Sequence, residues 1–398
     1  MTPVTSPYDD LPYRSSPIPW TSPDRLAVAS LLHGGPRLRS DAPYRVLEIG
    51  CGDGSNLVAL ALHWPHATFV GLDNAAVPLA TARERAETSG ASNTTFIFSD
   101  IQSADAVVEG RFDIILAHGV FSWVPPTTRD ALLTLCASRL GPGGLVYLNY
   151  NARPGWSVRG LVRDYLLNAT EGIADLHART SSARELASVL ADRFAGSEHP
   201  YSQLMANEFR FVVSTDPSHT AHEYLAPDNH AYSREQFLQL AERHSLVYIA
   251  DADFNYPSGR LPEQLSSVLD SVPVDARLHA ATADLLCYRQ LHSPILTHDG
   301  WQTTLPTLSE LEGLFMASGL VLQETDEAAG AWCFAHPSGA EVRVTSPEIA
   351  AALLALVRAP GIARRLRDLF VDVAAVVDDV RLLHRNGMIE LAMSRLDN

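Results

Sequence analysis

Lysine is absent from this chain of 398 residues, so all 30 of its strongly basic side chains are arginines. Together with 46 acidic residues they give a formal net charge of −16 at pH 7. Such a chain offers no basic stripe that could bind phosphates, which argues against nucleic acid as a partner. The acidic balance would instead attract cationic or neutral partners.

Cysteine is scarce, and long hydrophobic runs are missing. No apolar stretch reaches membrane length, and no basic segment followed by an apolar run opens the chain, so we expect neither a membrane span nor secretion. Hydrophobic residues still make up 46% of the chain, enough for two or three domains. The four cysteines are Cys51, Cys136, Cys287 and Cys333, and none of them forms a CxxC pair. This spacing predicts neither a disulfide framework nor a zinc site, and it fits a cytoplasmic setting.

What the sequence does contain is a glycine-rich turn between an expected strand and an expected helix. Residues 45–49 (RVLEI) predict a buried strand, and residues 56–63 predict an apolar helix. Alternate glycines permit positive φ angles and let a ligand lie against bare backbone, while the helix start presents unpaired N–H groups. This order predicts a site for a nucleoside-containing cofactor, built on three glycines: Gly50, Gly52 and Gly54.

The charges around the turn indicate which cofactor binds. Glu48 and Asp53 flank the glycines, and close to a diphosphate each carboxylate would cost about 1–4 kcal/mol. The glycines also run G-x-G-x-G rather than in the dinucleotide pattern G-x-G-x-x-G. The ammonium and sulfonium of S-adenosylmethionine (SAM) would be attracted by the same carboxylates. We therefore predict SAM as the cofactor, with a nicotinamide dehydrogenase as the alternative enzyme class.

Strands and helices alternate after the turn in the order of a doubly wound parallel sheet. We expect strands at 68–73, 95–98, 112–118 and 145–150, and a helix at 76–89. Ligands of such sheets bind at the carboxyl ends of the strands, where Asp73 is the acid expected to bind ribose. Five polar side chains fall at these ends: Glu48, Asp73, Asp100, His118 and Tyr150.

A Pro-rich arm at residues 1–43 precedes the sheet and includes an expected helix at 22–32, capped by Ser22 or Asp24. Its aromatic side chains have two interpretations. These side chains are Tyr8, Tyr13 and Trp20. They form either a lid over the cofactor and the acceptor pocket or a strap that fills an apolar groove.

The stretch HGVFSWVPPTTRDALL at 118–133 contains a candidate base. His118 could take a proton from an acceptor, or it is structural. Phe121 and Trp123 could line a cage for an alkylammonium or aliphatic acceptor, or pack in the core. Thr127 or Thr128 is expected to cap the next helix.

The pattern of Glu48 and the three glycines resembles the first motif of class I SAM-dependent methyltransferases, E/D-x-G-x-G-x-G. The segments YDDLPY, HGVFSWVPP and YNARPGW are more specific. With them, the chain from residue 6 to about 300 resembles bacterial methyltransferases that carry a methyltransferase regulatory domain, whose best-understood members are protein lysine methyltransferases acting on outer-membrane proteins. One segment departs from this pattern, because residues 284–293 keep only Arg289 of D-x-x-R-N-R-x-F-R.

This resemblance implies a Rossmann-like α/β sheet and assigns roles to residues. Asp100 would meet the adenine amino group, and Ile101 the adenine ring. The acceptor would be surrounded by Tyr8, Tyr13, His118, Trp123, Tyr150 and Trp156, and Phe121 is the further candidate named above. The cofactor would contact Glu48, Gly50, Cys51, Gly52, Asp53, Gly54, Asn56, Asp73, Asn74, Asp100, Ile101, Ala117 and His118.

Four regions are expected: the arm (1–43), the SAM-binding core (44–156), a helical insertion with a regulatory or substrate region (157–300), and a C-terminal α+β domain (301–398). The insertion should contain helices at 159–169 and 182–194, then a helix at 236–244 and a sixth strand at 246–250. A polar loop is favoured over a metal site for His219, His222, Glu223 and His230, because their spacing matches no established ligand set, and no metal is expected.

The C-terminal region predicts a winged-helix-like module or a plain α+β interaction domain. Its expected strands are 321–325, 332–336 and 340–344. Its expected helices are 308–318, 347–357, 362–370 and 373–384, with Gly387 after the last one.

The function predicted from these patterns is direct in-line transfer of a methyl group to a protein or peptide side chain, a lysine amine, with His118 or Tyr150 relaying the proton. An O- or N-methyltransferase that tailors a peptide or small natural product is the nearest alternative. A SAM-sensing scaffold without turnover is the non-enzymatic one, and a homodimer is possible.

Overall fold

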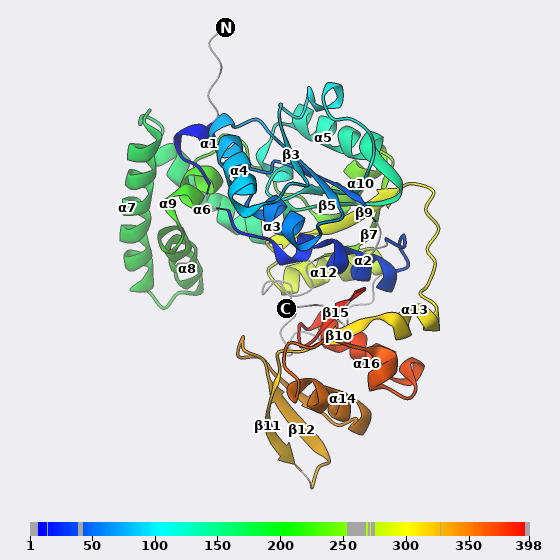
Figure 1. Ribbon diagram of the computed structural model, residues 1–398. Coiled ribbons are helices and arrows are strands. Elements are labelled where there is room, and N and C mark those ends of the chain that lie inside the picture. Colours follow the sequence, from blue (N-terminus) through cyan, green and yellow to red (C-terminus); the bar gives the residue numbers. More distant parts are fainter. Residues whose placement is uncertain are drawn as a thin grey trace.

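The computed structural model describes residues 7–394, except for residue 14, residues 39–42, residues 253–267, residue 270, residues 272–274 and residue 327. The start of the predicted arm and parts of the expected regulatory or substrate region (157–300) lie outside the described residues. Figure 1 shows an α/β sheet with its helices, a helical group at one side and a smaller C-terminal part below.

A seven-stranded sheet in the order β3-β2-β1-β4-β5-β9-β7 forms the centre. Strands β1 to β5 are parallel, and β9 runs antiparallel to both of its neighbours. The predicted α/β, Rossmann-like sheet is therefore confirmed. The strands are β1 (Arg45–Ile49), β2 (Thr68–Asp73), β3 (Thr94–Phe98), β4 (Phe112–Ala117), β5 (Leu140–Leu148), β7 (Leu246–Asp251) and β9 (Pro294–His298).

Alternate residues of each strand enter separate cores on the two faces of the sheet, as the two-residue period of a strand requires. Leu47 and Ile115 face one core, which contains α5 (Pro126–Arg139) and α10 (Arg234–Arg243). Val46 faces the other. That second core contains α2 (Pro23–Leu32) and α3 (Ser55–His63), with α4 (Ala76–Ser89) packed beside them.

The carboxyl end of β5 differs from the prediction. β5 ends at Leu148, and Tyr150 belongs to a separate two-stranded sheet, in which β6 (Tyr150–Asn151) pairs with β8 (Leu291–His292). β7 does return to the sheet, as predicted. It pairs with β9, a strand missed in the sequence because it is a five-residue run that begins with proline.

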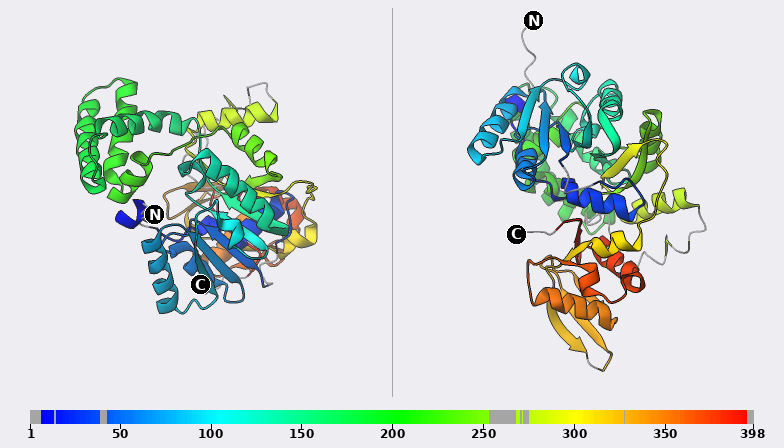
Figure 2. Two further views of the ribbon diagram at one scale, coloured as in Figure 1. Left: turned by 90° about the horizontal axis from the view of Figure 1, so that it is seen from above. Right: turned by 45° about the vertical axis from the view of Figure 1, so that its right-hand side comes forward.

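The helical insertion contains three helices rather than the two predicted: α6 (Gly155–Ala169), α7 (Leu176–Ala195) and α8 (Pro200–Ser214). They share a core of their own, which includes Val162, Ala183 and Phe209. Figure 2 shows this group extending from one side of the sheet. A short helix, α9 (Pro217–His219), and a π-helical turn, η4 (Thr220–Tyr224), follow α8 and lead the chain back toward the sheet.

The C-terminal part contains the predicted three-stranded antiparallel sheet: β11 (Val321–Asp326), β12 (Ala331–Ala335) and β13 (Glu341–Val344). The helix expected at 308–318 is wrong beyond α13 (Leu308–Gly313), because Phe315–Ala317 forms β10 and pairs with the end of the chain. The helix expected at 362–370 shortens to α15 (Leu366–Leu369). The other elements are α14 (Pro347–Val357), β14 (Arg364–Arg365), α16 (Val373–Arg385) and β15 (Glu390–Ala392).

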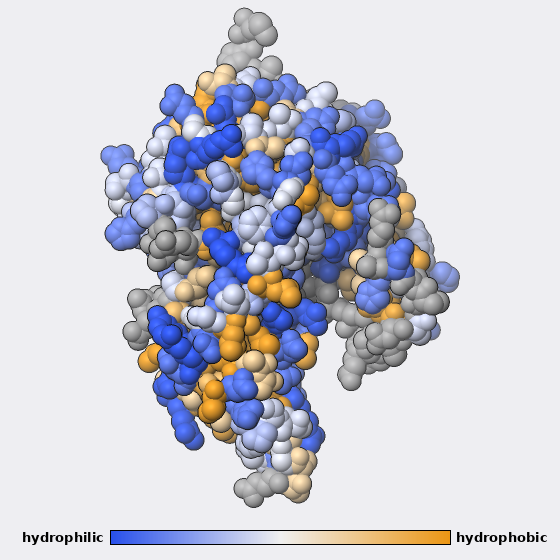
Figure 3. All heavy atoms as spheres, turned by 90° about the vertical axis from the view of Figure 1, so that its right-hand side faces the viewer, coloured by the Kyte–Doolittle hydropathy of each residue, from blue (hydrophilic) through white to orange (hydrophobic). Residues whose placement is uncertain are grey.

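Contacts with α2 attach the C-terminal part to the sheet. Asp24 does not cap α2 as predicted, since its buried carboxylate accepts hydrogen bonds from the Met393 N–H and the Ser394 hydroxyl. Arg37 forms an ion pair with Glu310 at 2.8 Å. On the face in Figure 3, hydrophobic residues gather around the narrow middle of the molecule, where these two parts meet.

Two other details concern the rest of the chain. The start of α5 is not capped by Thr127 or Thr128, whose hydroxyls accept hydrogen bonds from the Gln102 amide. Among the described residues, no helix is both long and apolar enough to cross a membrane. The remaining elements are α1 (Pro7–Asp10), η1 (Pro19–Thr21), η2 (Ala104–Ala106), η3 (Phe121–Trp123) and α12 (Ala276–Leu286).

Candidate functional site

A cavity of about 1140 Å³ lies over the carboxyl ends of the parallel strands. Three parts of the chain line it: the N-terminal arm, the ends of β1, β2 and β4 with the loops after them, and the helical insertion with η4. This is the position at which doubly wound sheets bind ligands. Most of the predicted site residues line this cavity.

The glycine turn forms the floor of the cavity. Gly50 and Gly52 have φ angles of +75° and +52°, which side chains rarely tolerate, and both line the cavity. The carboxylate of Asp73 holds the turn, because one oxygen accepts the Gly52 N–H at 2.8 Å and the other accepts the Ala75 N–H at 2.8 Å. Burial raises the pKa of Asp73, while these N–H donors oppose the increase.

Gly54 has a different role from the other two glycines. It also has a positive φ angle of +72°, but it does not line the cavity. A Cβ atom at Gly54 would lie 2.8 Å from the Cβ of Ala82 on α4. The third glycine therefore permits α3 and α4 to pack closely, and its contact with the cofactor stays a prediction.

Two other predicted site residues lie in the core instead of the cavity. Ala117 is fully buried in the core cluster on the α5 side of the sheet. Phe121 is also fully buried and packs edge-on against Phe237 at 5.4 Å between ring centroids. Core packing, the alternative left open for Phe121, is what the structure shows.

Glu48 is the carboxylate whose surroundings best match a cationic ligand. Its Oε1 accepts a hydrogen bond from the Asn56 amide at 2.9 Å. Its buried Oε2 has no hydrogen-bond partner among the described residues. Burial raises the pKa of Glu48 to about 7, and the negative charges of Asp73 and Asp53 add to the increase. An ammonium group would satisfy Oε2 and favour the charged carboxylate, so the floor of the cavity fits the methionine end of SAM.

Asp53 corrects part of the electrostatic prediction. Its Oδ2 forms an ion pair with Arg85 at 2.9 Å, and its Oδ1 accepts the Ser55 N–H at 3.0 Å at the start of α3. Asp53 lines the cavity, but its charge is balanced by the guanidinium. The second carboxylate at the turn is therefore Asp73 rather than Asp53.

The other residues expected to contact the cofactor also line the cavity: Cys51, Asn56, Asn74, Asp100 and Ile101. Asp100 accepts hydrogen bonds from the backbone N–H and the hydroxyl of Ser103, which fix its carboxylate in the loop after β3. Their contacts with a cofactor stay predictions.

His118 lies at the end of a chain of polar side chains. The indole N–H of Trp20 donates to the Tyr147 hydroxyl at 2.9 Å, and that hydroxyl lies 2.8 Å from His118 Nδ1. The Asn149 amide nitrogen lies 3.2 Å from the same Nδ1. Burial lowers the pKa of His118 to about 4, so the ring is neutral at pH 7 and a weak base. These contacts favour a positioning role over proton transfer.

The N-terminal arm forms a wall of the cavity. Tyr8 stacks on His222 with ring centroids 4.2 Å apart. The Tyr13 hydroxyl donates to Glu223 Oε1 at 3.3 Å and lies 3.1 Å from His219 Nδ1. The arm is thus fastened to η4 and to the end of α9, and all five side chains line the cavity.

From the sequence, His219, His222 and Glu223 are predicted to form a polar loop, with no role in the site. The structure uses them to bind the arm, and among the described residues no group of three or more His, Cys, Asp or Glu side chains is arranged to hold a metal ion. The one signal in the sequence was that HEYLAPDNHAY lies in a segment that carries the family resemblance.

Aromatic side chains form the far end of the cavity. Trp123 and Trp156 contact each other edge-to-face at 5.5 Å, and both line the cavity. Tyr150 also lines it and stacks on Phe237 at 4.3 Å. Burial raises the pKa of Tyr150 far above its usual value, so this phenol keeps its proton at neutral pH. Tyr150 can donate a hydrogen bond but cannot serve as a base there.

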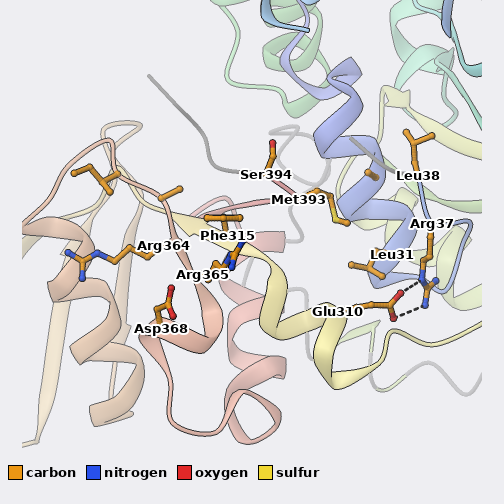
Figure 4. Close-up of a pocket in the computed structure, with 13 residues that line it drawn as sticks. Leu31, Arg37, Leu38, Glu310, Phe315, Arg364, Arg365, Asp368, Met393 and Ser394 are labelled. Carbon is orange, nitrogen blue, oxygen red and sulfur yellow. Dashed lines mark hydrogen bonds and ion pairs between the residues drawn. The ribbon is translucent and has the colours of Figure 1, made fainter. Parts of the chain in front are cut away.

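A second cavity, of about 940 Å³, lies between α2 and the C-terminal part (Figure 4). The Arg37–Glu310 ion pair lies at one side of it, and the Arg365 guanidinium lies over the Phe315 ring at 5.1 Å. None of the residues that line it belongs to the glycine turn or to the strand ends. The candidate functional site is therefore the cavity over the sheet.

Two family matches cover separate parts of the chain. Residues 46–144 match "Methyltransferase domain", and residues 204–298 match "Predicted methyltransferase regulatory domain". The first match covers the glycine turn, nearly all of β1 to β4 and the beginning of β5. The second contains η4, α10, β7 and β9.

Relatives and solved structures extend the similarity. The chain is 30% identical to "Uncharacterized protein RP789" of Rickettsia prowazekii over 301 residues, which are 74% of this chain and 53% of the relative. It is 26% identical to "Uncharacterized protein sll1526" of Synechocystis over 261 residues, 63% of this chain and 50% of that protein. The chain thus spans about half the length of these two relatives.

One solved structure has nearly the same fold, "PKMT2 from Rickettsia typhi in complex with AdoHcy". Its TM-score is 0.79 at 22% identity, and the match covers 96% of this chain and 78% of that one. The chain thus contains a match to a methyltransferase domain followed by a match to a methyltransferase regulatory domain, and it has the class I methyltransferase fold.

Proposed function

We propose that this protein transfers the methyl group of SAM to the side-chain amine of a lysine in a protein or peptide. The fold shared with PKMT2, a protein lysine methyltransferase, supports the class of acceptor. That fold includes the regulatory domain and not the parallel sheet alone.

The cofactor end of the cavity suits SAM, which supplies a methyl group bound to a positively charged sulfur. Glu48 would bind the ammonium through its open Oε2, and Asp73 would bind the ribose hydroxyls. Asp100 and Ile101 would hold the adenine. In this arrangement, Asn56 orients Glu48, and the Gly52 and Ala75 N–H groups orient Asp73.

The acceptor end suits an amine on an aliphatic stem. Tyr8, Tyr13, Trp123 and Trp156 present aromatic surfaces that attract an ammonium group and pack against methylene groups. Holding the amine nitrogen about 3–3.5 Å from the methyl carbon, in line with the sulfur, supplies most of the rate. Because Tyr150 keeps its proton and His118 is a weak base, neither is suited to remove a proton from the acceptor.

The observation that carries the proposal is the unsatisfied Glu48 Oε2 above the glycine turn. Titration calorimetry with SAM and with S-adenosylhomocysteine (SAH) tests it first, and we expect saturable binding of both. Bacterial protein extract, incubated with SAM that carries a deuterated methyl group, should then yield labelled methyl-lysine by mass spectrometry. Tight binding of NAD without binding of SAM or SAH would overturn the proposal.

A second candidate is methylation of a peptide or small natural product. The size of the cavity supports this function, because about 1140 Å³ can hold both SAM and a small acceptor under the arm. Labelled metabolites without labelled protein in the same experiment would select this function.

We also propose a cytoplasmic setting, supported by four cysteines that are all free thiols. A homodimer stays a prediction, and sedimentation measures it.

A further inference from the structure

Glu223 is a carboxylate in the wall of the cavity that the transfer described above does not use. It lies on η4, a π-helical turn. Such turns are rare in proteins, and where they occur they often lie at functional sites. Its Oε1 accepts the Tyr13 hydroxyl at 3.3 Å and lies 3.4 Å from His219 Nδ1. Within the described part of the chain, no hydrogen-bond donor reaches its Oε2. The side chain is 21% exposed, and it lines the cavity.

The charges that face Glu223 come from three directions. Arg159 on α6 is the nearest strong base, but its Nε donates to Glu208 Oε2 at 3.2 Å and its Nη2 donates to the Gln290 side chain at 3.1 Å. Glu208 therefore balances the Arg159 charge. His219 on α9 is neutral at pH 7, because burial and then Arg159 lower its pKa to about 4. From the arm, Tyr13 contributes only a neutral hydroxyl.

Burial raises the pKa of Glu223 to about 7, while Arg159 and the Tyr13 hydroxyl oppose the increase. A carboxyl group in this state gains a proton easily when a donor arrives and loses it again near neutral pH. Glu48 has the same property at the floor of the cavity. The cavity thus holds two carboxylates that each have one open oxygen, one beside the glycine turn and one in the regulatory domain.

Aromatic rings connect Glu223 with the cofactor end. Tyr8 lines the cavity and stacks on His222, and burial followed by the charges of Asp73 and Glu223 raises its pKa to about 12. Phe211 and Trp156 complete the wall on the side of the regulatory domain. A carboxylate surrounded by aromatic surfaces is the arrangement that selects an organic cation.

We propose that Glu223 binds the ammonium group of a basic acceptor and takes its proton before methyl transfer. This inference rests on the proposed function and assigns to the regulatory domain the recognition of a cationic acceptor. An N–H bond of the ammonium breaks, the proton goes to Glu223 Oε2, and the electron pair stays on nitrogen. The neutral nitrogen then bonds to the methyl carbon while the carbon–sulfur electron pair goes to sulfur. The product leaves as a methylammonium ion, and Glu223 releases its proton to water.

The test measures binding of two probes to the full chain saturated with SAH, by ligand-detected NMR titration. Nα-acetyl-lysine methylamide carries the cation, and Nα-acetyl-norleucine methylamide is its neutral counterpart. We expect Glu223→Gln to weaken lysine-probe binding at least tenfold and to change norleucine-probe binding less than twofold. Glu185→Gln, an exposed glutamate on α7, is the matched control and should change neither. Equal lysine-probe binding by the wild type and Glu223→Gln overturns the inference.

A second measurement covers the case in which Glu223→Gln fails to fold. In the wild type, lysine-probe binding should weaken more than threefold between pH 8 and pH 6, because a protonated Glu223 no longer attracts the ammonium, while norleucine-probe binding stays constant. A lysine affinity that does not change with pH overturns the inference. Failure of the wild type to bind SAH overturns the proposed function instead, and the probes are then titrated into the cofactor-free protein to judge Glu223 alone.

Discussion

Two groups of charged side chains in the molecule differ in how they are paired. His292, whose ring centroid lies 5.3 Å from that of Tyr150, forms ion pairs with two carboxylates: Nε2 lies 2.9 Å from Asp284, and Nδ1 lies 3.4 Å from Asp251 without a hydrogen bond. In the cavity, Glu48 and Glu223 each keep one oxygen without a partner among the described residues.

The pKa values follow this difference. Burial alone would lower the pKa of His292, but Asp251 and Asp284 outweigh it and raise the value to about 9. The same pairing holds the pKa of Asp251 well below its usual range despite burial. In the cavity, burial dominates and raises both glutamates to about 7. A buried charge that has ion-pair partners stabilises the fold, whereas a carboxylate with an unpaired oxygen can bind a cationic ligand.

The largest expected effect is on the paired group. His292→Ala removes the cation shared by Asp251 and Asp284, which then keep Arg234 at 3.8 Å and Arg289 at 3.4 Å, and should lower the free energy of unfolding by about 3–5 kcal/mol. The affinity for SAH should change less than threefold, because His292 does not line the cavity. Urea denaturation and calorimetry measure the two quantities. His66→Ala, an exposed histidine, is the control, and a His292→Ala protein as stable as this control would break the comparison.

The next effect concerns the close packing at Gly54, compared with a glycine outside the turn that also has a positive φ angle. Gly54→Ala combines a positive φ angle with a Cβ 2.8 Å from Ala82 and should cost about 2–4 kcal/mol of unfolding free energy. Gly119→Ala has a similar φ angle of +69°, but nothing lies within 4 Å of its Cβ, so only about 1–2 kcal/mol is expected. Urea denaturation of both variants measures the difference, and equal losses would contradict the close packing of α3 against α4.

The open carboxylate is tested by the affinity for the cofactor. Glu48→Gln removes the charge that would bind the SAM ammonium and should weaken SAH binding about 10–100-fold, the equivalent of about 1.5–3 kcal/mol. Asp53→Asn should weaken binding less than about threefold, because Arg85 already balances that charge. Titration calorimetry compares the two variants. A larger loss in Asp53→Asn would show that the charge pairing at the turn is misassigned.

The smallest expected effect is the number of protons that the protein releases when SAH binds. In the ligand-free protein, the raised pKa of Glu48 means that the folded state binds more protons than the unfolded state between about pH 4.5 and pH 7. Its stabilising contribution is therefore present below pH 4.5 and is lost as the pH rises through 7. SAH binding should release less than one proton per site near pH 6, measured by calorimetry in buffers of different ionisation enthalpy. Glu48→Gln should abolish this release.

His292 also makes the free energy of unfolding fall as the pH rises, but over a higher pH range than Glu48. Its folded pKa of about 9 lies above the unfolded value of about 6.5, so its contribution is complete below pH 6.5 and is lost as the pH rises through 9. Unfolding free energies measured between pH 6 and pH 10 should show this loss in the wild type and not in His292→Ala. Proton release on SAH binding should be unchanged by His292→Ala, which keeps the two groups distinct.

The amino-acid sequence by itself determined the parts of the molecule that depend on local patterns. β1, β2, α4 and α14 have the predicted bounds, because short apolar runs, glycine turns and helical periodicity are properties of neighbouring residues. The glycine turn and the acids Glu48 and Asp73 were located for the same reason. The SAM cofactor was predicted from the charges of Glu48 and Asp53, which flank the turn.

Only the tertiary structure decided which polar groups are paired and which stay open. Arg85 lies 32 positions after Asp53, and Tyr13 lies 210 positions before Glu223, so no local pattern could show either contact. The antiparallel strand β9 and the position of Tyr150 in β6 likewise depend on pairing with distant strands. Pairing across such distances is set by how the sheet and the insertion pack together, and packing is what separates a structural charge from one that can bind a ligand.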